Sequence, residues 1–340
     1  MAVQQDLIKK ISEAVDQSAH SEYDIKEIYT DPSTVVGKNE FLFFIKPEVL
    51  DRKGGVDVDA VLELILGKID EFGLVIHNAK VLSANYLEQH DIIAQHYGVI
   101  NKIARDAANS LSESAQEKFE ELYGTKVSDV KLIGGLEVLD QYPAFNAFSL
   151  DYLWQNLENK KLAGGTYVEK IKLDNETLYV VNGFHPRQLK HFTTEGRSIV
   201  VMTLSGDLDW SVARNAFTGA TNPANAAAGS IRRSLLDNKD KLGLAEVGQG
   251  TNGVHLSAGP VEALVELRRY NSDFSATNGE KQFTDFSFGK ALEATLGDKL
   301  EQITDNIDVV VDGKTTSIFD LTEEKNSDEA LAILKEVLGS

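Results

Sequence analysis

Two kinds of residue are scarce in this sequence: cysteine, of which there is none, and basic residues relative to acidic ones. The absence of cysteine excludes disulfide bonds, thiolate metal sites and a cysteine nucleophile. The 34 lysine and arginine residues stand against 53 aspartate and glutamate residues, so the formal net charge is −19 at pH 7. Because a nucleic-acid groove and an anionic membrane surface both require a basic face, neither is expected as the main partner.

Long apolar segments are also missing. No hydrophobic run approaches the length of a membrane span, and the polar, amphipathic N-terminus has neither a basic start nor a hydrophobic signal region. We therefore expect a soluble, cytoplasmic protein. At 340 residues the chain is long for one compact domain, so two domains and one heavily decorated domain are both compatible with its length.

The most informative stretch runs from Gly219 to Glu266 and contains arginines suited to phosphate, a turn rich in glycine and asparagine, and one histidine. A nucleophilic histidine attacks through a neutral ring nitrogen, so another group must hold the second nitrogen. The helix expected from Pro260 presents Glu266 away from its apolar face, so Glu266 can turn back toward His255 and Ser257 can bridge them. From these residues alone, however, a single histidine near a turn is more often structural than catalytic.

The same stretch contains a misleading motif. Gly248, Gly250 and Gly253 form the pattern GxGxxG, which is found in dinucleotide-binding proteins. That site requires a strand before the glycines and a helix that opens directly on them. Here the glycines precede Val254 to Pro260, a sequence typical of a strand end and a loop, and a dinucleotide site is therefore rejected.

Three segments carry a resemblance to a known family. GATNPANAAAGSIR ends at Arg232 and NGVHLSAGPVEALVE begins at Asn252. They resemble the active-site half of the nucleoside diphosphate kinases, whose pattern is GATNPxxAxxGTIR, then NxxHxSDS, then a glutamate on the next helix. The segment FLFFIKPEVL from Phe41 to Leu50 is similar to the strand ending in IKPD that opens the family. The resemblance covers about half of the chain, in the blocks 41–97 and 183–270.

The resemblance implies a catalytic group. His255 would be the nucleophile that carries the phosphoryl group, Glu266 would orient its imidazole, and Ser257 would support Glu266. Lys46 would bind the transferring phosphate and the ribose hydroxyl, although from the bare sequence it is expected to be a solvated strand end. Tyr97, from a His-Tyr pair, would lie beside the phosphoryl group.

The resemblance also implies a nucleotide site. Thr221 would bind the outer phosphates, Arg232 would supply positive charge, and Asn252 would hold the 3′-hydroxyl. Phe184 and Leu189 would sandwich the nucleobase without contacting its edge. Mg²⁺ is the implied cofactor, held mainly by the nucleotide phosphates, so no metal ligand is expected from the protein.

The chain departs from the family pattern in three places. The position of a phosphate-binding arginine is occupied by Asn215, with Arg214 beside it. Because one residue rotates a helix by about 100°, Arg214 can reach the site only if the end of the helix carries an extra residue. Extra sequence also lies between Arg232 and Asn252, and the aspartate that follows the histidine motif is replaced by Ala258.

Hydrophobic periodicity and turn signals predict the elements. The expected helices are 4–17, 58–72, 86–97, 112–123, 288–303 and 327–338, with a further helix from Asp207 as its N-cap. The expected strands are 41–45, 74–82 and 198–204, with hairpins at 166–181, turning at Asp174-Asn175, and at 307–319, turning at Asp312-Gly313. Their order implies an α+β fold, a ferredoxin-like antiparallel sheet with helices on one face.

Four parts follow from this order. We expect an N-terminal helical extension at 1–40, a nucleoside diphosphate kinase-like domain at 41–98 and 183–270, an insertion at 99–182 and a C-terminal α/β extension at 271–340. The predicted function is ping-pong transfer of a γ-phosphate from a nucleoside triphosphate to a nucleoside diphosphate by a homo-oligomer. The alternatives are a non-catalytic nucleotide-binding or assembly protein on a kinase-derived scaffold, and phosphohistidine relay to a protein acceptor.

Overall fold

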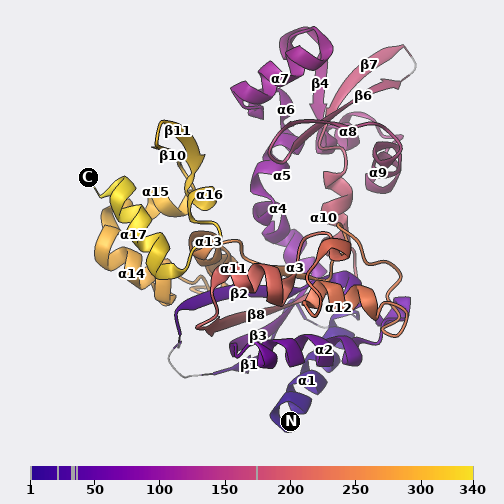
Figure 1. Ribbon diagram of the computed structural model, residues 1–340. Coiled ribbons are helices and arrows are strands. Elements are labelled where there is room, and N and C mark those ends of the chain that lie inside the picture. Colours follow the sequence, from indigo (N-terminus) through magenta and orange to yellow (C-terminus); the bar gives the residue numbers. More distant parts are fainter. Residues whose placement is uncertain (1, 21–22, 32–34, 36, 174, 340) are drawn as a thin grey trace. The chain divides into compact units, whose positions relative to one another are not determined.

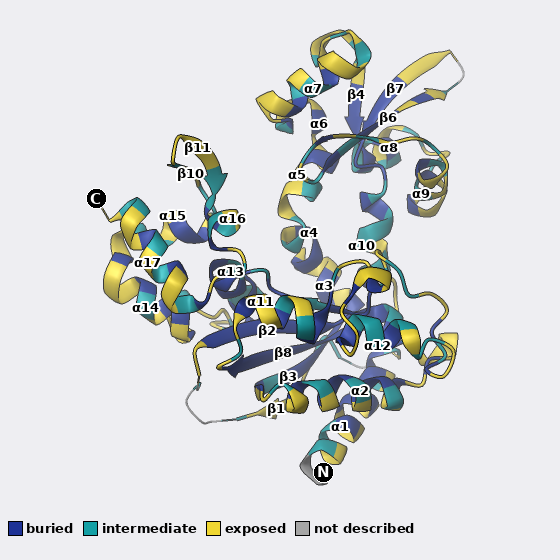
Figure 2. Ribbon diagram, in the orientation of Figure 1, coloured by how far each residue is buried: buried dark blue, intermediate teal, exposed yellow. Residues whose placement is uncertain are grey.

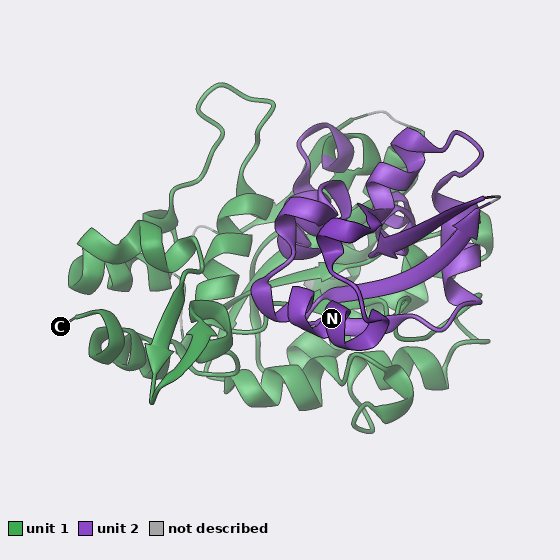
Figure 3. Cartoon of the chain, turned by 90° about the horizontal axis from the view of Figure 1, so that it is seen from above, with its two compact units in different colours: residues 1–86, 195–340 green, residues 87–194 purple. Residues whose placement is uncertain are grey.

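The computed structural model describes residues 2–20, 23–31, 35, 37–173 and 175–339 (Figure 1). The chain forms two compact units. Unit 1 comprises residues 1–86 and 195–340, and unit 2 comprises residues 87–194 (Figure 3). Unit 2 thus begins before and ends after the predicted insertion at 99–182. The predicted C-terminal extension lies in the same compact unit as the main sheet.

Unit 1 is built around a five-stranded sheet in the order β1-β3-β8-β2-β9. The strands are β1 (Ile25–Thr30), β2 (Asn39–Ile45), β3 (Val75–Ser83), β8 (Ser198–Gly206) and β9 (Val254–Leu256). Every pair of neighbours is antiparallel, so β8 separates the parallel strands β2 and β3, and β2 separates β8 and β9. This is the split βαβ arrangement of ferredoxin-like folds, and the predicted fold class is confirmed.

Helices cover both faces of this sheet. The first face carries α1 (Ala2–Ser18), α2 (Val58–Glu71) and α12 (Ile231–Asp237), whose apolar side chains share a core with β2, β3 and β8. The second face carries α13 (Pro260–Asn271), where Tyr270 packs on Phe44 of β2 and Asn271 binds Thr203 of β8. The prediction of helices on one face is therefore wrong. Its cause is visible in β2 and β8, which are buried along their whole length and so need cover on both sides (Figure 2).

Most of the predicted helices and strands are present, but several differ in their bounds. The predicted helix at 86–97 is divided into α3 (Ala84–Gln89) and α4 (Ile92–His96), because Asp91 adopts a left-handed conformation with φ 51°. The helix expected from Asp207 begins instead at Trp210 as α11 (Trp210–Val212), with Asp209 as its N-cap. Asp207 is engaged elsewhere, since its carboxylate accepts a hydrogen bond from the backbone N–H of Lys38 at 3.1 Å.

The segment after α11 has an unusual backbone. Residues Ala213–Thr218 form a π-helical turn, η4, whose i→i+5 hydrogen bonds enclose one residue more than those of an α-helix. It is followed by the Gly219 turn and by α12, whose N-cap Ser230 accepts a hydrogen bond from Arg233 N. The condition stated above for Arg214, an extra residue at this helix end, is met.

Unit 2 has its own four-stranded sheet in the order β4-β7-β6-β5, with β4 and β7 parallel and the other pairs antiparallel. Apolar clusters lie on both faces of the sheet. The predicted hairpin is present as β6 and β7, and its turn residue Asp174 lies outside the described residues. The strands are β4 (Lys131–Gly134), β5 (Lys160–Ala163), β6 (Thr166–Leu173) and β7 (Glu176–Val181), and the further helices are α5 (Gly98–Arg105), α6 (Ala107–Ser110), α7 (Glu113–Tyr123), α8 (Gly135–Gln141), α9 (Ala147–Gln155) and α10 (His185–Thr193).

The C-terminal segment of unit 1 adds helices and a hairpin. The predicted helix at 288–303 is two helices, α14 (Ser287–Leu296) and α15 (Leu300–Thr304), separated by a short turn from Gly297. The predicted hairpin is confirmed as β10 (Asp308–Val311) and β11 (Lys314–Ser317), with positive φ at both turn residues as a type I′ turn requires. Two helices follow, α16 (Ile318–Thr322) and α17 (Ser327–Leu338). Within the described part of the chain, no helix has the length and apolar character needed to span a membrane.

Candidate functional site

His255 lies on the edge strand β9, opposite Phe44 of β2. The two rings stack with their centroids 4.6 Å apart and an interplanar angle of 21°. Gly253 directly precedes this strand, at a position that favours glycine. Its φ of 82° is one that other residues seldom adopt, and a Cβ here would lie 2.3 Å from Cδ1 of Leu235. His255 therefore lies on a buried strand, but its side chain remains 17% exposed.

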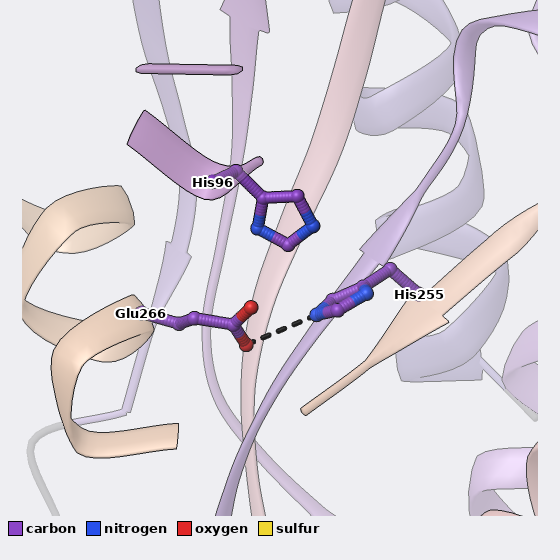
Figure 4. A group of neighbouring side chains, drawn as sticks. All are labelled: His96, His255 and Glu266. Carbon is purple, nitrogen blue, oxygen red and sulfur yellow. Dashed lines mark hydrogen bonds and ion pairs between the residues drawn. The ribbon is translucent and has the colours of Figure 1, made fainter. Parts of the chain in front are cut away.

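Glu266 faces His255 from helix α13 (Figure 4). Its Oε2 lies 3.0 Å from Nε2 of His255 and accepts a hydrogen bond from Ser257 Oγ at 2.5 Å. Glu266 is only 2% exposed, and a buried carboxylate requires donors of this kind. When Nε2 carries the proton shared with Glu266, Nδ1 carries the lone pair, so this geometry selects the tautomer that a nucleophile needs.

Lys46 lies at the end of β2 and is only 9% exposed, so the expectation of a solvated strand end is wrong. Its Nζ donates a hydrogen bond to Oδ1 of Asn252 at 2.8 Å. Burial lowers the pKa of Lys46 to about 8, with Glu48 raising it and Arg232 lowering it further. An anion that approaches such a buried lysine stabilises its charged form, because the anion raises the pKa back toward the ordinary value.

Asn252 connects this lysine to two loops. Its Nδ2 donates to the carbonyl of Thr221 at 3.0 Å and to that of Gln249 at 3.1 Å. Asn252 is 2% exposed, whereas the side chain of Thr221 is exposed. Lys46, Asn252 and the Thr221 turn therefore form one connected group, although these residues are far apart in the sequence.

Arg232 stabilises the same turn. Its Nη1 donates to the carbonyl of Gly219 at 2.8 Å, and its Nη2 donates to the carbonyl of Val254 at 3.0 Å. These bonds join the turn to the strand that carries His255. Two N–H groups of Arg232 are thus used within the protein. Its positive charge is not neutralised by these bonds, because backbone carbonyls carry no net charge.

Arg214 and Asn215 take different directions from η4. Asn215 Nδ2 donates to the carbonyl of Ser211 at 2.8 Å within its own helix. Arg214 instead pairs with two carboxylates of the C-terminal segment: its Nη2 lies 3.1 Å from Glu323 Oε1, and its Nε lies 3.7 Å from Glu324 Oε1. The sequence did not predict these two partners, since no pattern links residues so far apart.

Glu262, one turn before Glu266 on α13, is a further residue that the sequence did not single out. Burial raises its pKa to about 8, and the Glu266 carboxylate raises it further, while Arg214 lowers it and Glu323 raises it. The four-residue spacing from Glu266, which places both side chains on one side of the helix, was the only signal available.

Three predicted site residues belong to unit 2, whereas the others lie in unit 1. Phe184 packs against Trp154 and Tyr167 in a core of that unit. Tyr97 lies against Phe192, and Leu189 is partly buried on α10. His96, drawn in Figure 4, also belongs to unit 2.

Comparison with known proteins shows that the chain is similar to several solved structures. No protein-family model matches the chain, and no curated protein matches it in sequence. Solved structures to which it is similar include a nucleoside diphosphate kinase from Encephalitozoon cuniculi, with 14% identity over 73% of this chain and 96% of that chain and a TM-score of 0.34. Another is an NDP kinase from Pyrobaculum aerophilum, with 19% identity over 68% and 94% of the chains and a TM-score of 0.32.

A third similar structure is a transition state mimic of nucleoside-diphosphate kinase from Borrelia burgdorferi with bound vanadate and ADP. Its identity is 16% over 73% of this chain and 94% of that chain, with a TM-score of 0.31. At such low identities and TM-scores, the chemistry of this chain has to be derived from its own residues.

Proposed function

We propose that this chain is a nucleoside diphosphate kinase that transfers the γ-phosphate of a nucleoside triphosphate to a nucleoside diphosphate through a phosphohistidine at His255. The observation that supports this most directly is the short contact of Glu266 with both His255 Nε2 and Ser257 Oγ. A protein that only binds a nucleotide does not need an imidazole held in one tautomer by a buried carboxylate.

The first half-reaction begins with the lone pair on Nδ1 of His255. A bond forms between Nδ1 and the γ-phosphorus, while the bond from that phosphorus to the β–γ bridging oxygen breaks and the diphosphate leaves. The ring becomes positively charged in this step, and the carboxylate of Glu266 stabilises it. In the second half-reaction a terminal oxygen of another diphosphate attacks the phosphorus, the N–P bond breaks, and neutral His255 is restored.

The remaining residues align and neutralise the phosphates, which is the main requirement of phosphoryl transfer. Lys46 and Arg232 supply positive charge, and Thr221 binds the outer phosphates. Asn252 holds Lys46 through its Oδ1, and the second lone pair of that oxygen accepts a hydrogen bond from the 3′-hydroxyl. Tyr97 is assigned a place beside the phosphoryl group, as the resemblance implies.

Two further assignments complete the nucleotide site. Phe184 and Leu189 are assigned to the nucleobase, as the resemblance implies. The group around Lys46 presents ammonium, guanidinium, amide and hydroxyl groups, which suit a phosphate better than a bare metal ion. Mg²⁺ bound mainly by the nucleotide phosphates would add further neutralisation of their charge.

A second candidate is a non-catalytic nucleotide-binding or assembly protein. Two observations favour it: Arg214 is paired with Glu323 and Glu324, and Arg232 binds two backbone carbonyls. The first neutralises a positive charge, and the second uses N–H donors that would otherwise be available to a triphosphate. The prediction of a homo-oligomer applies to either candidate and is checked by sedimentation of the purified protein.

The deciding experiment is incubation of the protein with Mg²⁺ and γ-labelled ATP, followed by acid and alkali treatment and a chase with GDP. We expect an acid-labile, alkali-stable label that moves to GTP and is absent from His255→Ala. His20→Ala, a substitution of an exposed histidine in the same unit, is the matched control and should label normally. Absence of label in the wild-type protein, together with measurable nucleotide binding, would favour the second candidate.

A further inference from the structure

The loop between α16 and α17 is attached to the backbone that follows His255. Glu324 N donates to the carbonyl of Ala258 at 2.9 Å. A Cβ on Gly259 would lie 2.5 Å from the carbonyl oxygen of Thr322, so the two backbones are in close contact at a position that requires glycine. The C-terminal segment is thus part of the surroundings of the catalytic group.

Asn326, at the end of this loop, anchors it to the main sheet. Its Oδ1 accepts hydrogen bonds from Trp210 N at 3.0 Å and from Asn39 Nδ2 at 2.9 Å. Its Nδ2 donates to Asp209 at 3.0 Å. Bonds to β2 and to the start of α11 therefore hold the loop beside the π-helical turn that carries Arg214.

The loop places two carboxylates on one edge of the Arg214 guanidinium. Glu323 lies against Nη2 and Glu324 lies nearest Nε. The Nε and Nη2 edge is one with which arginine forms two parallel hydrogen bonds to a carboxylate or a phosphate. The carboxylates therefore occupy positions in which phosphate oxygens would be recognised.

The ion pairs of Arg214 with Glu323 and Glu324 are exposed enough for another anion to replace the carboxylates. The side chains of Arg214, Glu323 and Glu324 are 30%, 45% and 39% exposed, and ion pairs at such exposure are weak. Glu324 also has a φ of 57°, a conformation that residues other than glycine seldom adopt. A nucleotide phosphate, with more charge than a carboxylate, is chemically able to replace these partners.

The group also lies within electrostatic reach of the catalytic helix. Glu262, on the helix that carries Glu266, is influenced by the charges of both Arg214 and Glu323. The turn η4 itself packs on β9, the strand of His255. The element that carries Arg214 thus contacts the strand that carries His255, and this neighbourhood is the basis for assigning Arg214 to phosphates that approach His255.

We propose that Glu323 and Glu324 are an internal counter-anion for Arg214 that nucleotide phosphates must displace, so that the C-terminal segment sets the nucleotide affinity of the site proposed above. Without nucleotide, the carboxylates neutralise Arg214. With nucleotide, phosphate oxygens take the Nε and Nη2 edge and the two carboxylates turn to solvent. The segment after α13 thereby determines the nucleotide affinity of the site. This inference rests on the kinase site proposed above.

The test is the Kd of Mg·ADP, measured by calorimetry on the full chain with the double substitution Glu323→Gln and Glu324→Gln. We expect binding about two- to tenfold tighter than in the wild type, the range expected for releasing two exposed ion pairs. Adding Arg214→Ala should remove that gain. The control substitutes Glu301→Gln and Glu336→Gln, which are exposed residues of the same segment and change the net charge equally.

Weaker or unchanged ADP binding in the double variant would overturn the proposal, because the carboxylates would then position Arg214 or be irrelevant to it. An equal gain in the control pair would also overturn it, by assigning the effect to net charge. No binding of ADP by any variant would overturn it together with the nucleotide site. Tighter binding without a phosphohistidine label would overturn only the kinase activity and leave the counter-anion role standing.

Discussion

Nε2 of His255 lies 3.0 Å from Oε2 of Glu266, and the two residues come from opposite sides of a loop that joins an edge strand to a helix. The contact combines a partly exposed imidazole with an almost fully buried carboxylate. Such a carboxylate holds the ring in one orientation and one tautomer, and it stabilises a positive charge that develops on the ring.

Glu266→Gln tests this contact directly. We expect the rate of His255 phosphorylation to fall by roughly 10²-fold or more, because a neutral amide cannot stabilise the charged ring and can hold the wrong tautomer. The rate is measured by single-turnover labelling with γ-labelled ATP. Glu262→Gln is the matched control, because burial and the Glu266 carboxylate both raise the pKa of Glu262 and so favour the neutral carboxyl that glutamine resembles. A Glu266→Gln protein that labels at the wild-type rate would contradict the assigned role.

Ser257→Ala removes one donor from the buried carboxylate of Glu266. We expect the free energy of unfolding to fall by about 1–3 kcal/mol, the usual effect of depriving a buried polar group of a partner. Urea denaturation followed by circular dichroism measures this change. Ser211→Ala, at an exposed serine of the same unit, should leave the free energy of unfolding within about 0.5 kcal/mol of wild type. Equal effects of the two substitutions would show that Ser257 does not support Glu266.

Lys46 predicts a dependence of nucleotide binding on pH. Because burial lowers its pKa to about 8, the unliganded protein loses this positive charge as pH rises through that value, and ADP affinity should fall over the same range. Lys46→Met should bind ADP weakly at pH 7 and should lack this part of the pH dependence. Calorimetric titration between pH 6.5 and roughly 9.5 measures both effects. A Lys46→Met protein that shows the wild-type pH profile would exclude Lys46 as the group responsible.

Lys46 also affects stability, with a defined sign. Its pKa is about 8 in the folded protein and near 10.5 in the unfolded chain. Between these values the unfolded chain binds more protons, so the contribution of Lys46 to the free energy of unfolding increases with pH. Lys80, whose pKa burial also lowers to about 8, acts in the same window. Comparison with Lys46→Met isolates one lysine: the free energy of unfolding of wild type minus that of Lys46→Met should increase as pH rises from about 8 to about 10.5.

Gly259→Ala tests the attachment of the C-terminal loop. A Cβ at this position would lie 2.5 Å from the carbonyl oxygen of Thr322, so the loop has to move away. We expect a loss of about 1–3 kcal/mol in the free energy of unfolding. The shift of Glu323 and Glu324 should also tighten ADP binding. Gly250→Ala is the control, because a Cβ there would meet no described atom within 4 Å. Unchanged stability of Gly259→Ala would mean that the two backbones separate without cost.

Local patterns predicted much of the fold and part of the candidate site. Strand β2 and helix α2 followed from a continuous apolar run and from a repeat of three and four residues, and both are present. His255, Ser257 and Glu266 could be grouped because they lie on one strand, its loop and the next helix, where spacing alone indicates which side chains can meet. The second helical layer was missed, since periodicity does not show which face of a buried strand is covered.

The sequence by itself determined the strongly periodic elements and the His255 group, because both depend on residues close together in the chain. The tertiary structure alone decided the burial of Lys46, whose partner Asn252 lies 206 residues away. It also decided the pairing of Arg214 with Glu323 across 109 residues, and with it the link between the C-terminal segment and the proposed phosphate site. Contacts at such separations depend on how the elements pack around the sheet, which no local spacing encodes.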